Sequence, residues 1–501
     1  MIGARQPAPP CATLCYAFAC MPDNHFDLAA AARREMLQEG FNPDFPPGAD
    51  QQLAALKNRP APAAGRDLRS LLWSSIDNDT SRDLDQIEVA DRVDTGIRIR
   101  IGIADVDADV EIGSPIDRHA AEQTTTVYTG VQTFSMLPEQ LSTDLTSLNE
   151  EADRAAIVVE MVVGTDGSFT SPDVYRALVR NRAQLTYNGV GPWLEGRAPA
   201  PAKVAANADL QAQLKLQDEA AQALREQRHR LGALQFDRIE AEAVVASGQV
   251  TGISAHRKNR ATDLIEDFMI AANEVMARTL QNAGVSSIRR VVRSPERWPR
   301  IVELAAQYGE KLPAEPDSKA LDMFLQKRRL VDEAHFPDLS LAIIKLMGPG
   351  EYVLARTGDP DPGHFALAAH DYTHSTAPNR RFADLVTQRL IKAVLNKQPA
   401  PYSDDELAAI ARNCTLREDA ARKVERSMNK RIAAVAMANR VGQSFAAVVT
   451  GVTPKGVFVR VQDPPVEGRL MRGEAGVDTG DRIQVKLVGT NPERGFIDFA
   501  R

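Results

Sequence analysis

An acidic segment that leads directly into an apolar strand constrains this chain more than any other feature of its sequence. Within Ile76–Glu88 (IDNDTSRDLDQIE), five of thirteen residues are carboxylates: Asp77, Asp79, Asp83, Asp85 and Glu88. After a VDTG turn, isoleucines at every second position from Ile97 to Ile103 predict a strand. The strands should hold at least Asp83 and Asp85 near the domain interior. Two carboxylates about 4 Å apart repel by about 4 kcal/mol at an effective dielectric constant of 20, so the segment requires cations.

The kind of cation follows from the surrounding pattern. Counted from Asp77, the acids approach the ligand spacing of an EF-hand calcium loop, but Arg82 stands where that loop needs glycine. A strand, rather than the helix of an EF-hand, is also expected after Glu88. Magnesium fits better, because it takes one or two carboxylates and leaves its other positions to water and phosphate. A pair of magnesium ions would suit phosphodiester hydrolysis, and a solvated acidic loop is the simpler alternative.

A second informative segment, His364–Leu395, reads HFALAAHDYTHSTAPNRRFADLVTQRLIKAVL. Pro378 suits the first turn of a helix, which would place Arg380 and Arg381 at the positive end of the helix dipole. Cations are unfavourable there, and a phosphate bound by the helix N-terminus and the arginines would explain both features. An ion pair between Arg380 and Asp384 at i+4 is the alternative, and the two can coexist.

The distribution of expected helices, strands and Pro/Gly breaks along the chain predicts several domains. With 501 residues and 44% hydrophobic composition, the chain is long enough for two to four domains. Short helices broken by Pro and Gly precede a strand-rich part from residue 76 to about 184. Short strands separated by turns fill 443–501, as in a small barrel. Between these parts, helices are expected at 209–230, 263–282, 378–396 and 404–440.

Charge and cysteine content exclude some classes of protein. The net charge of −7 argues against a protein coated in nucleic acid, although three basic clusters could line a channel or form solvated helix faces: Arg289–Arg300, Lys327–Arg329 and Arg422–Arg431. No apolar run reaches the roughly 20 residues of a membrane span, so no membrane partner is expected. Three cysteines fall in a leader, Cys11–Met21, interpreted as disordered or as preceding a start at Met21. The remaining Cys414 is typical of a cytoplasmic protein.

Both informative segments resemble motifs of the RNB family, the exoribonucleases of the RNase II and RNase R type. IDNDTSRDLDQ resembles the family's aspartate motif, and GHFALAAHDYTHSTAPNRRFADLVTQRL resembles its arginine motif. Between them, the family's order is kept by VYTGVQTFSMLPEQLSTDLTSLNE, RNRAQLTYNGV, GALQFDRIEAE and LIEDFMIAANE. The likeness covers residues 70–440.

The resemblance implies an α+β multidomain protein. A mixed α/β RNB catalytic domain (71–440) would follow a leader and small helical N-terminal domain (1–70), which replaces the family's usual cold-shock domains. A C-terminal OB-fold β-barrel (441–501) resembles the RNA-binding module of the ribosomal S-one type. Its GVFVRV strand offers Phe458 and Arg460, a stacking and basic mixture suited to single-stranded RNA. A purely structural barrel is the alternative.

The activity implied is processive 3′-to-5′ hydrolysis of single-stranded RNA to nucleoside 5′-monophosphates in RNA decay or processing, by a monomer with one or two magnesium ions. Asp77, Asp83 and Asp85 match the family's metal-binding aspartates. Arg380 matches the arginine that steadies the scissile phosphate, with Arg381 beside it. Tyr128 and Phe236 match the aromatic residues that clamp the terminal bases, and Tyr187 matches a tyrosine near the catalytic phosphate. Glu266 and Glu425 match acidic residues that help to position RNA. Stacking on such aromatic rings tolerates any base sequence.

One departure from the family pattern bears on activity. The family's motif usually ends in two adjacent aspartates, but here the second is Gln86. An amide oxygen can coordinate magnesium but supplies no charge and cannot act as a base. An active nuclease is favoured because three aspartates, Arg380 and the aromatic residues remain together. The alternatives are an RNA-binding regulator with an inactive centre and a metal-dependent phosphatase, which would leave the terminal OB-fold unexplained.

Overall fold

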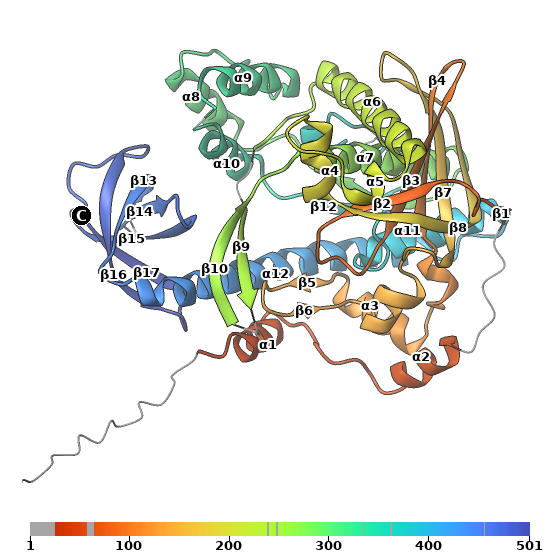
Figure 1. Cartoon of the computed structure of the whole chain (residues 1–501), viewed down its shortest axis with the longest axis horizontal. Helices are drawn as coiled ribbons and strands as arrows, with labels where there is room; N and C mark the ends of the chain where they lie inside the picture. Colours follow the sequence, from red (N-terminus) through yellow and green to blue (C-terminus); the bar gives the residue numbers. More distant parts are fainter. Residues whose placement is uncertain are drawn as a thin grey trace, which may run out of the picture.

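The computed structural model describes residues 26–57, 65–237, 240–246, 249–333, 335–360, 363–454 and 456–501. The leader cysteines and the alternative start at Met21 lie outside these residues. Figure 1 shows a large mixed α/β part joined to a small C-terminal barrel by one long helix, α12 (Asp404–Met437), drawn in blue. None of the described helices is both long and apolar enough to cross a membrane.

A six-stranded sheet in the order β1-β8-β2-β3-β4-β7 forms the centre of the large part. Strand β8 also pairs with β7, so β8, β2, β3, β4 and β7 are hydrogen-bonded in a ring. The alternation that predicted β4 is confirmed, because Ile97, Ile99, Ile101 and Ile103 are all buried. The strands are β1 (Arg66–Asp67), β2 (Trp73–Asp77), β3 (Gln86–Val93), β4 (Gly96–Ala104), β7 (Asp153–Val163) and β8 (Phe169–Thr186).

Helices cover this sheet and share its main hydrophobic cluster. Helix α6 packs on β3 and β4, and α7 packs on α6 and β2. Asn207 caps α6 through its side chain, and the left-handed Gly232 ends it, as helix capping favours. The helices of this part are α3 (Pro115–Gln123), α4 (Tyr187–Leu194), α5 (Ala202–Ala205), α6 (Ala208–Leu231), α7 (Arg260–Asn282) and α11 (Phe382–Leu395).

The N-terminal segment is helical, as expected, with α1 (Leu28–Gln38) and α2 (Ala49–Lys57). Helix α1 shares one hydrophobic cluster with α12 and with a short hairpin, β5 (Val127–Tyr128) and β6 (Thr133–Phe134). Part of the basic stretch predicted in α12 pairs with acids of α1: Arg431 lies 2.5 Å from Glu35, and Lys423 lies 3.5 Å from Glu39. That stretch therefore holds α1 instead of forming only a solvated face.

The C-terminal barrel is closed in the order β13-β14-β15-β17-β16. The end of α12 contributes Ala434 and Met437 to its core. A helical segment with its own cluster, α8 (Trp298–Gln307), α9 (Ser318–Val331) and α10 (Phe336–Met347), lies between barrel and sheet in Figure 1. The remaining strands are β9 (Glu240–Ala246), β10 (Gln249–His256), β11 (Ser287–Val291), β12 (Glu351–Ala355), β13 (Ser444–Thr453), β14 (Gly456–Val461), β15 (Val466–Arg472), β16 (Arg482–Asn491) and β17 (Phe496–Ala500).

Candidate active site

The acidic segment lies at one end of the central sheet, in the connection between β2 and β3. Asp77 ends β2, where its Oδ1 accepts hydrogen bonds from the Asn78 N–H (2.7 Å) and the Ser81 hydroxyl (2.8 Å). Asp85 immediately precedes β3 and is 2% exposed, while Asp83 is partly buried. The expectation that the strands draw Asp83 and Asp85 inward is confirmed.

The arginine segment meets this connection from almost 300 residues away. The Asn379 N–H donates to Asp85 Oδ1 at 3.1 Å, and Arg380 Nε donates to Asp85 Oδ2 at 3.3 Å. The Arg380 side chain is 46% exposed, so part of its guanidinium remains open to a ligand.

Two sequence expectations about this segment are corrected. Helix α11 begins at Phe382, four residues after Pro378, because the preceding backbone turns at Ala377 instead of entering the helix. The ion pair with Asp384 that was the alternative role for Arg380 is formed by Arg381 at 2.7 Å. Arg380 is directed to Asp85 instead, so the two neighbouring arginines serve different partners.

Burial and like charge dominate the electrostatics of the acids. Burial raises the pKa of Asp85 to about 7 against the opposing charge of Arg380, and Asp83 adds to the rise. Burial also raises the pKa of Asp83, which Arg380 lowers and Asp77 raises. A second cation near these carboxylates would relieve both effects.

Tyr128 and Glu425 are brought to the same place by β5 and α12. The Tyr128 N–H donates to Glu425 Oε1 at 3.2 Å, and the Tyr128 residue is 44% exposed. The residue that precedes β5 is fixed to the arginine segment, since the Thr126 N–H donates to the carbonyl of Arg380 at 3.0 Å. Burial raises the pKa of the Tyr128 hydroxyl, the charge of Arg380 lowers it, and the charge of Asp83 adds to the rise.

Tyr187 approaches from another side, at the first position of α4. Burial raises the pKa of its hydroxyl, and the charges of Asp77, Glu88 and Glu266 add to the rise. Glu266, on α7, is half exposed and forms an ion pair with Lys258. The site therefore gathers Asp77, Asp83, Asp85, Arg380, Tyr128, Tyr187, Glu266 and Glu425 from six separate segments of the chain.

The structure also reveals an acid that sequence reasoning did not single out. Glu88, on β3, is fully buried, and neither carboxylate oxygen has a hydrogen-bond partner among the described residues. Gln86, two residues earlier on the same face of the strand, is also buried. The available signal was the spacing of these two residues, because a two-residue step along a strand keeps an acid on the same face.

The donor set suits a hard divalent cation. Carboxylate and hydroxyl oxygens are the ligands that magnesium prefers. Among the described residues, no group of three His, Cys, Asp or Glu side chains is close enough to hold an ion alone. Magnesium usually retains several waters and takes only one or two carboxylates, so the ligand roles of Asp77, Asp83 and Asp85 stay predictions.

Comparison with protein families now decides the membership of this chain. Residues 65–397 match the RNB domain, and residues 443–501 match the RNase II-type exonuclease C-terminal S1 domain. The chain belongs to the RNB family. Ribonuclease R of Escherichia coli is 31% identical over 501 residues, covering 91% of this chain and 60% of that protein. This RNB chain therefore spans about three-fifths of the length of that curated relative.

Solved structures share the RNB fold. Mycoplasma genitalium RNase R, solved in complex with ribose methylated single-stranded RNA, matches with a TM-score of 0.84 and 23% identity over 95% of this chain and 78% of that one. Yeast Ssd1, described as a pseudonuclease, matches with a TM-score of 0.70 and 18% identity over 94% of this chain and 58% of that one. At such identities these matches show the fold, and they confirm the mixed α/β domain with a C-terminal barrel.

Three predicted RNA-contacting residues of this RNB chain have their recorded contacts outside the acidic segment. Phe236 packs against the hydrophobic cluster of α8–α10. Phe458 and Arg460 lie on β14 of the S1 barrel, and Arg460 forms an ion pair with Asp338 of α10. The Arg460 charge is therefore balanced within the protein, and the RNA-binding roles of all three residues stay predictions.

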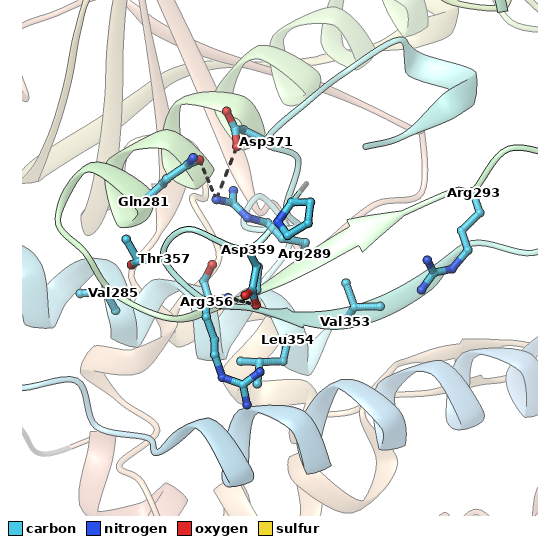
Figure 2. Close-up of a pocket in the computed structure, with 13 residues that line it drawn as sticks. Gln281, Val285, Arg289, Arg293, Val353, Leu354, Arg356, Thr357, Asp359 and Asp371 are labelled. Carbon is cyan, nitrogen blue, oxygen red and sulfur yellow. Dashed lines mark hydrogen bonds and ion pairs between the residues drawn. The ribbon is translucent and has the colours of Figure 1, made fainter. Parts of the chain in front are cut away.

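The basic cluster predicted at Arg289–Arg300 partly lines a separate cavity of about 290 Å³. Figure 2 shows that Arg289 points toward Gln281 and Asp371, and Arg289 lies 3.8 Å from the Asp371 carboxylate. Two further arginines of the lining also have acidic partners, Arg293 with Glu351 at 2.5 Å and Arg356 with Asp404 at 2.7 Å. This cavity thus adds little uncompensated positive charge for phosphate.

Proposed function

We propose that this chain is a magnesium-dependent exoribonuclease that degrades single-stranded RNA processively from its 3′ end and releases nucleoside 5′-monophosphates. The observation that carries the proposal is the contact of Arg380 with Asp85 inside a cluster of acids that has too few cations. Such a cluster is suited to divalent ions, and the exposed side of Arg380 is suited to phosphate. Membership of the RNB family supports this combination.

Each gathered side chain has a physical role in this proposal. Asp77, Asp83 and Asp85 would hold one or two magnesium ions, which supply an activated water and neutralise charge on the scissile phosphate. Arg380 donates to the phosphate and positions it. Tyr128 offers a ring on which a base near the 3′ end can stack.

Other residues shape the path of the RNA. The Tyr187 hydroxyl is protonated at neutral pH, as any tyrosine with a pKa near or above its ordinary value is, so it can donate a hydrogen bond to a phosphate oxygen. Burial and nearby acids raise its pKa further. Glu266 and Glu425 offer acceptors for ribose hydroxyls, which distinguish RNA from DNA. Phe236 would clamp a terminal base together with Tyr128, and the barrel residues Phe458 and Arg460 would contact RNA farther from the cleavage site. We expect the protein to act as a monomer in the cytoplasm.

A second candidate function is an RNA-binding regulator without nuclease activity. Gln86 favours it, because the amide supplies no charge where the family's motif usually has an aspartate. The structural likeness to Ssd1, a pseudonuclease, indicates that this fold also occurs without nuclease activity. The two candidates differ in whether RNA is shortened.

The test is incubation of 5′-labelled single-stranded RNA with the protein, with magnesium or with EDTA, followed by gel electrophoresis. A magnesium-dependent ladder that collapses to a short 5′ remnant, with mononucleotide products, is expected. Asp85→Asn is the matched inactive control, because it keeps the size of the side chain and removes its charge. Intact RNA together with a gel shift would contradict nuclease activity and favour the regulator.

A further inference from the structure

A segment outside the aspartate and arginine motifs, residues 141–148, contacts both of them and is called the bridging segment below. It begins with a π-helical turn, Leu141–Leu145, which the Thr146 N–H closes by donating to the first carbonyl of the turn at 3.0 Å. Such turns are rare in proteins and are frequently found at functional sites. The next residues are buried, with Thr146 4%, Ser147 0% and Leu148 1% exposed. Their polar groups therefore need partners inside the protein.

The Ser147 hydroxyl holds the backbone on both sides of Asp83. It accepts a hydrogen bond from the Leu84 N–H at 2.9 Å and donates to the Arg82 carbonyl at 2.8 Å. These two groups belong to the two peptide units that flank Asp83, so one hydroxyl fixes both units. The Leu148 N–H adds a bond to the Leu84 carbonyl at 3.0 Å. The bridging segment therefore sets the direction in which the Asp83 side chain leaves the backbone.

The neighbouring Thr146 holds the arginine segment. Its hydroxyl donates to Asn379 Oδ1 at 2.7 Å, and Asn379 is 1% exposed. The backbone N–H of the same asparagine donates to Asp85 Oδ1 at 3.1 Å, and the next residue, Arg380, donates to Asp85 Oδ2 at 3.3 Å. Thr146 is thus linked through one asparagine to the arginine and to the buried aspartate with which that arginine pairs.

Packing alone does not account for an asparagine at this position. The Nδ2 atom of Asn379 is buried and has no hydrogen-bond partner among the described residues, which costs free energy. A leucine has nearly the same shape and would avoid this cost. The asparagine instead provides an acceptor for Thr146, and this bond joins two residues that are 233 positions apart in the chain. The contact between the segments therefore explains the amide.

The bridging segment contacts groups that the proposed reaction has to align. Asp83 and Asp85 are predicted metal ligands, and Arg380 is predicted to hold the phosphate, so their side chains must act on one phosphate. A displacement of about 1 Å at such a site can lower the rate about 100-fold. Arg380 and Asp85 contact each other through the groups that phosphate and metal would occupy. The hydroxyls of Thr146 and Ser147 contact backbone groups and an amide instead, so their bonds remain in place when ligands bind.

We propose that Thr146 and Ser147 are positioning residues of the candidate active site. Ser147 fixes the aspartate motif at Asp83, and Thr146 fixes the arginine motif through Asn379, so that metal ligands and phosphate donor stay in register. This inference rests on the proposed function, because it assumes that Arg380 binds the scissile phosphate. It deepens that function by assigning the register of the site to residues outside both motifs.

The first test separates the two hydroxyls by kcat and by metal binding. Thr146→Val removes the hydroxyl and keeps the branched shape. It should lower kcat on single-stranded RNA about tenfold or more with little change in KM, because the phosphate is bound but misplaced. Thr146→Ser keeps the hydroxyl and should keep the wild-type kcat. Unchanged kcat in Thr146→Val would overturn the role of Thr146.

Metal binding tests Ser147 in the absence of RNA. Mn²⁺ is titrated into metal-free protein, and the free ion is followed by electron paramagnetic resonance. Ser147→Ala releases both peptide units that flank Asp83 and should weaken Mn²⁺ binding several-fold. Thr146→Val should leave Mn²⁺ binding unchanged, because the Ser147 bonds remain. Unchanged binding in Ser147→Ala would remove Ser147 from the inference.

Two comparisons distinguish positioning from a general loss of stability. Thr387, on α11, is 0% exposed, and its hydroxyl donates to the Ala383 carbonyl of its own helix at 2.9 Å. Thr387→Val also removes a buried hydroxyl and should keep both kcat and Mn²⁺ binding. In an Arg380→Met background, Thr146→Val should lower kcat no further, because it acts through Arg380. An equal further loss in that background would assign Thr146 a purely structural role.

Hydrogen–deuterium exchange measures the bridge itself, in metal-free protein without RNA. Thr146→Val should speed exchange several-fold in the peptide that carries the Asn379 N–H, and Thr387→Val should not. Where Thr146→Val does not fold, Asn379→Leu removes the same bond from its other side and takes its place in both assays.

Failure of this inference is distinguishable from failure of the proposed function. A ladder of RNA products, together with unchanged kcat and unchanged exchange in Thr146→Val, would overturn the bridge and leave the nuclease in place. Intact RNA with wild type, together with faster exchange in Thr146→Val, would support the bridge and contradict the nuclease.

Discussion

The two ends of α11 both meet acidic clusters, and the clusters are neutralised very differently. Near the C-terminal end, Arg389 lies 2.9 Å from Asp107 and 2.8 Å from Asp117. Lys392 lies 2.9 Å from Asp105 and 2.7 Å from Asp107. Every acid of this cluster has a cation within ion-pair distance, and the Arg389 side chain is only 1% exposed.

Before the N-terminal end of α11, the balance is reversed. Asp77, Asp83 and Asp85 gather there with Arg380, which is 46% exposed, while Arg381 is occupied by Asp384. The difference teaches that buried acids alone do not identify a functional site in this fold. Acids with matching cations stabilise the structure, and acids without them are prepared for a ligand.

The largest expected effect is a loss of stability on disruption of the balanced cluster near the C-terminal end of α11. Arg389→Met would leave Asp107 and Asp117 without their buried guanidinium partner, and removing one side of a buried ion pair costs about 3–5 kcal/mol. We expect the free energy of unfolding, measured by urea denaturation, to fall by that amount. The exposed pair of Arg92 with Glu219 provides the control, because Arg92→Met should cost less than about 1 kcal/mol. Equal losses in the two variants would remove the distinction between the clusters.

A smaller effect, a loss of about 2.7 kcal/mol in transition-state stabilisation, is expected on substitution of Arg380, before the N-terminal end of α11. Arg380→Met should lower kcat on single-stranded RNA about 100-fold, because it removes the donor proposed to bind the phosphate. Its cost in stability should be small, because the Asp85 carboxyl, whose pKa is already raised to about 7, can take a proton when Arg380 is absent. Arg381→Met is the matched neighbour and should show the reverse, since Asp384 is fully buried and would lose its partner. Kinetics and urea denaturation of both variants test this. A stability loss in Arg380→Met as large as in Arg381→Met would assign Arg380 a structural role.

Local patterns predicted much of the fold. The helices expected at 209–230 and 263–282 appear as α6 and α7 with nearly the same bounds, because apolar periodicity and capping residues agree there. Helix α11 starts later than expected because residues before it pair with a distant segment. The Phe382 N–H donates to the carbonyl of Thr124 at 2.8 Å, a contact that periodicity does not encode.

The site was predictable only in part for the same reason. The unusual density of acids indicated a need for cations, but the approach of Asn379 and Arg380 to Asp85 depends on tertiary packing. The family resemblance, and not spacing, suggested that the two segments belong together. Glu88 was missed because it appeared as one more acid in a charged run, and its burial follows from pairing with β2 and β4.

The smallest expected effect is the pH dependence of the free energy of unfolding, measured in protein kept free of metal by EDTA. Burial raises the pKa of Asp85 to about 7 from an ordinary value of 3.8, so between these values the native state holds a proton that the unfolded state has released. The free energy of unfolding should therefore fall as pH rises, by about 2.5 kcal/mol between pH 5 and pH 8, and Asp85→Asn should lack this part of the fall. At pH 8, Asp85→Asn should be more stable than wild type, because it removes a poorly compensated buried charge. Asp107→Asn should be less stable, because it removes contacts with Arg389 and Lys392. Urea denaturation at both pH values measures these differences. A loss of stability in both variants at pH 8 would contradict the comparison. It would mean that the charge of Asp85 is compensated by Arg380 as fully as the charge of Asp107 is by its two cationic partners.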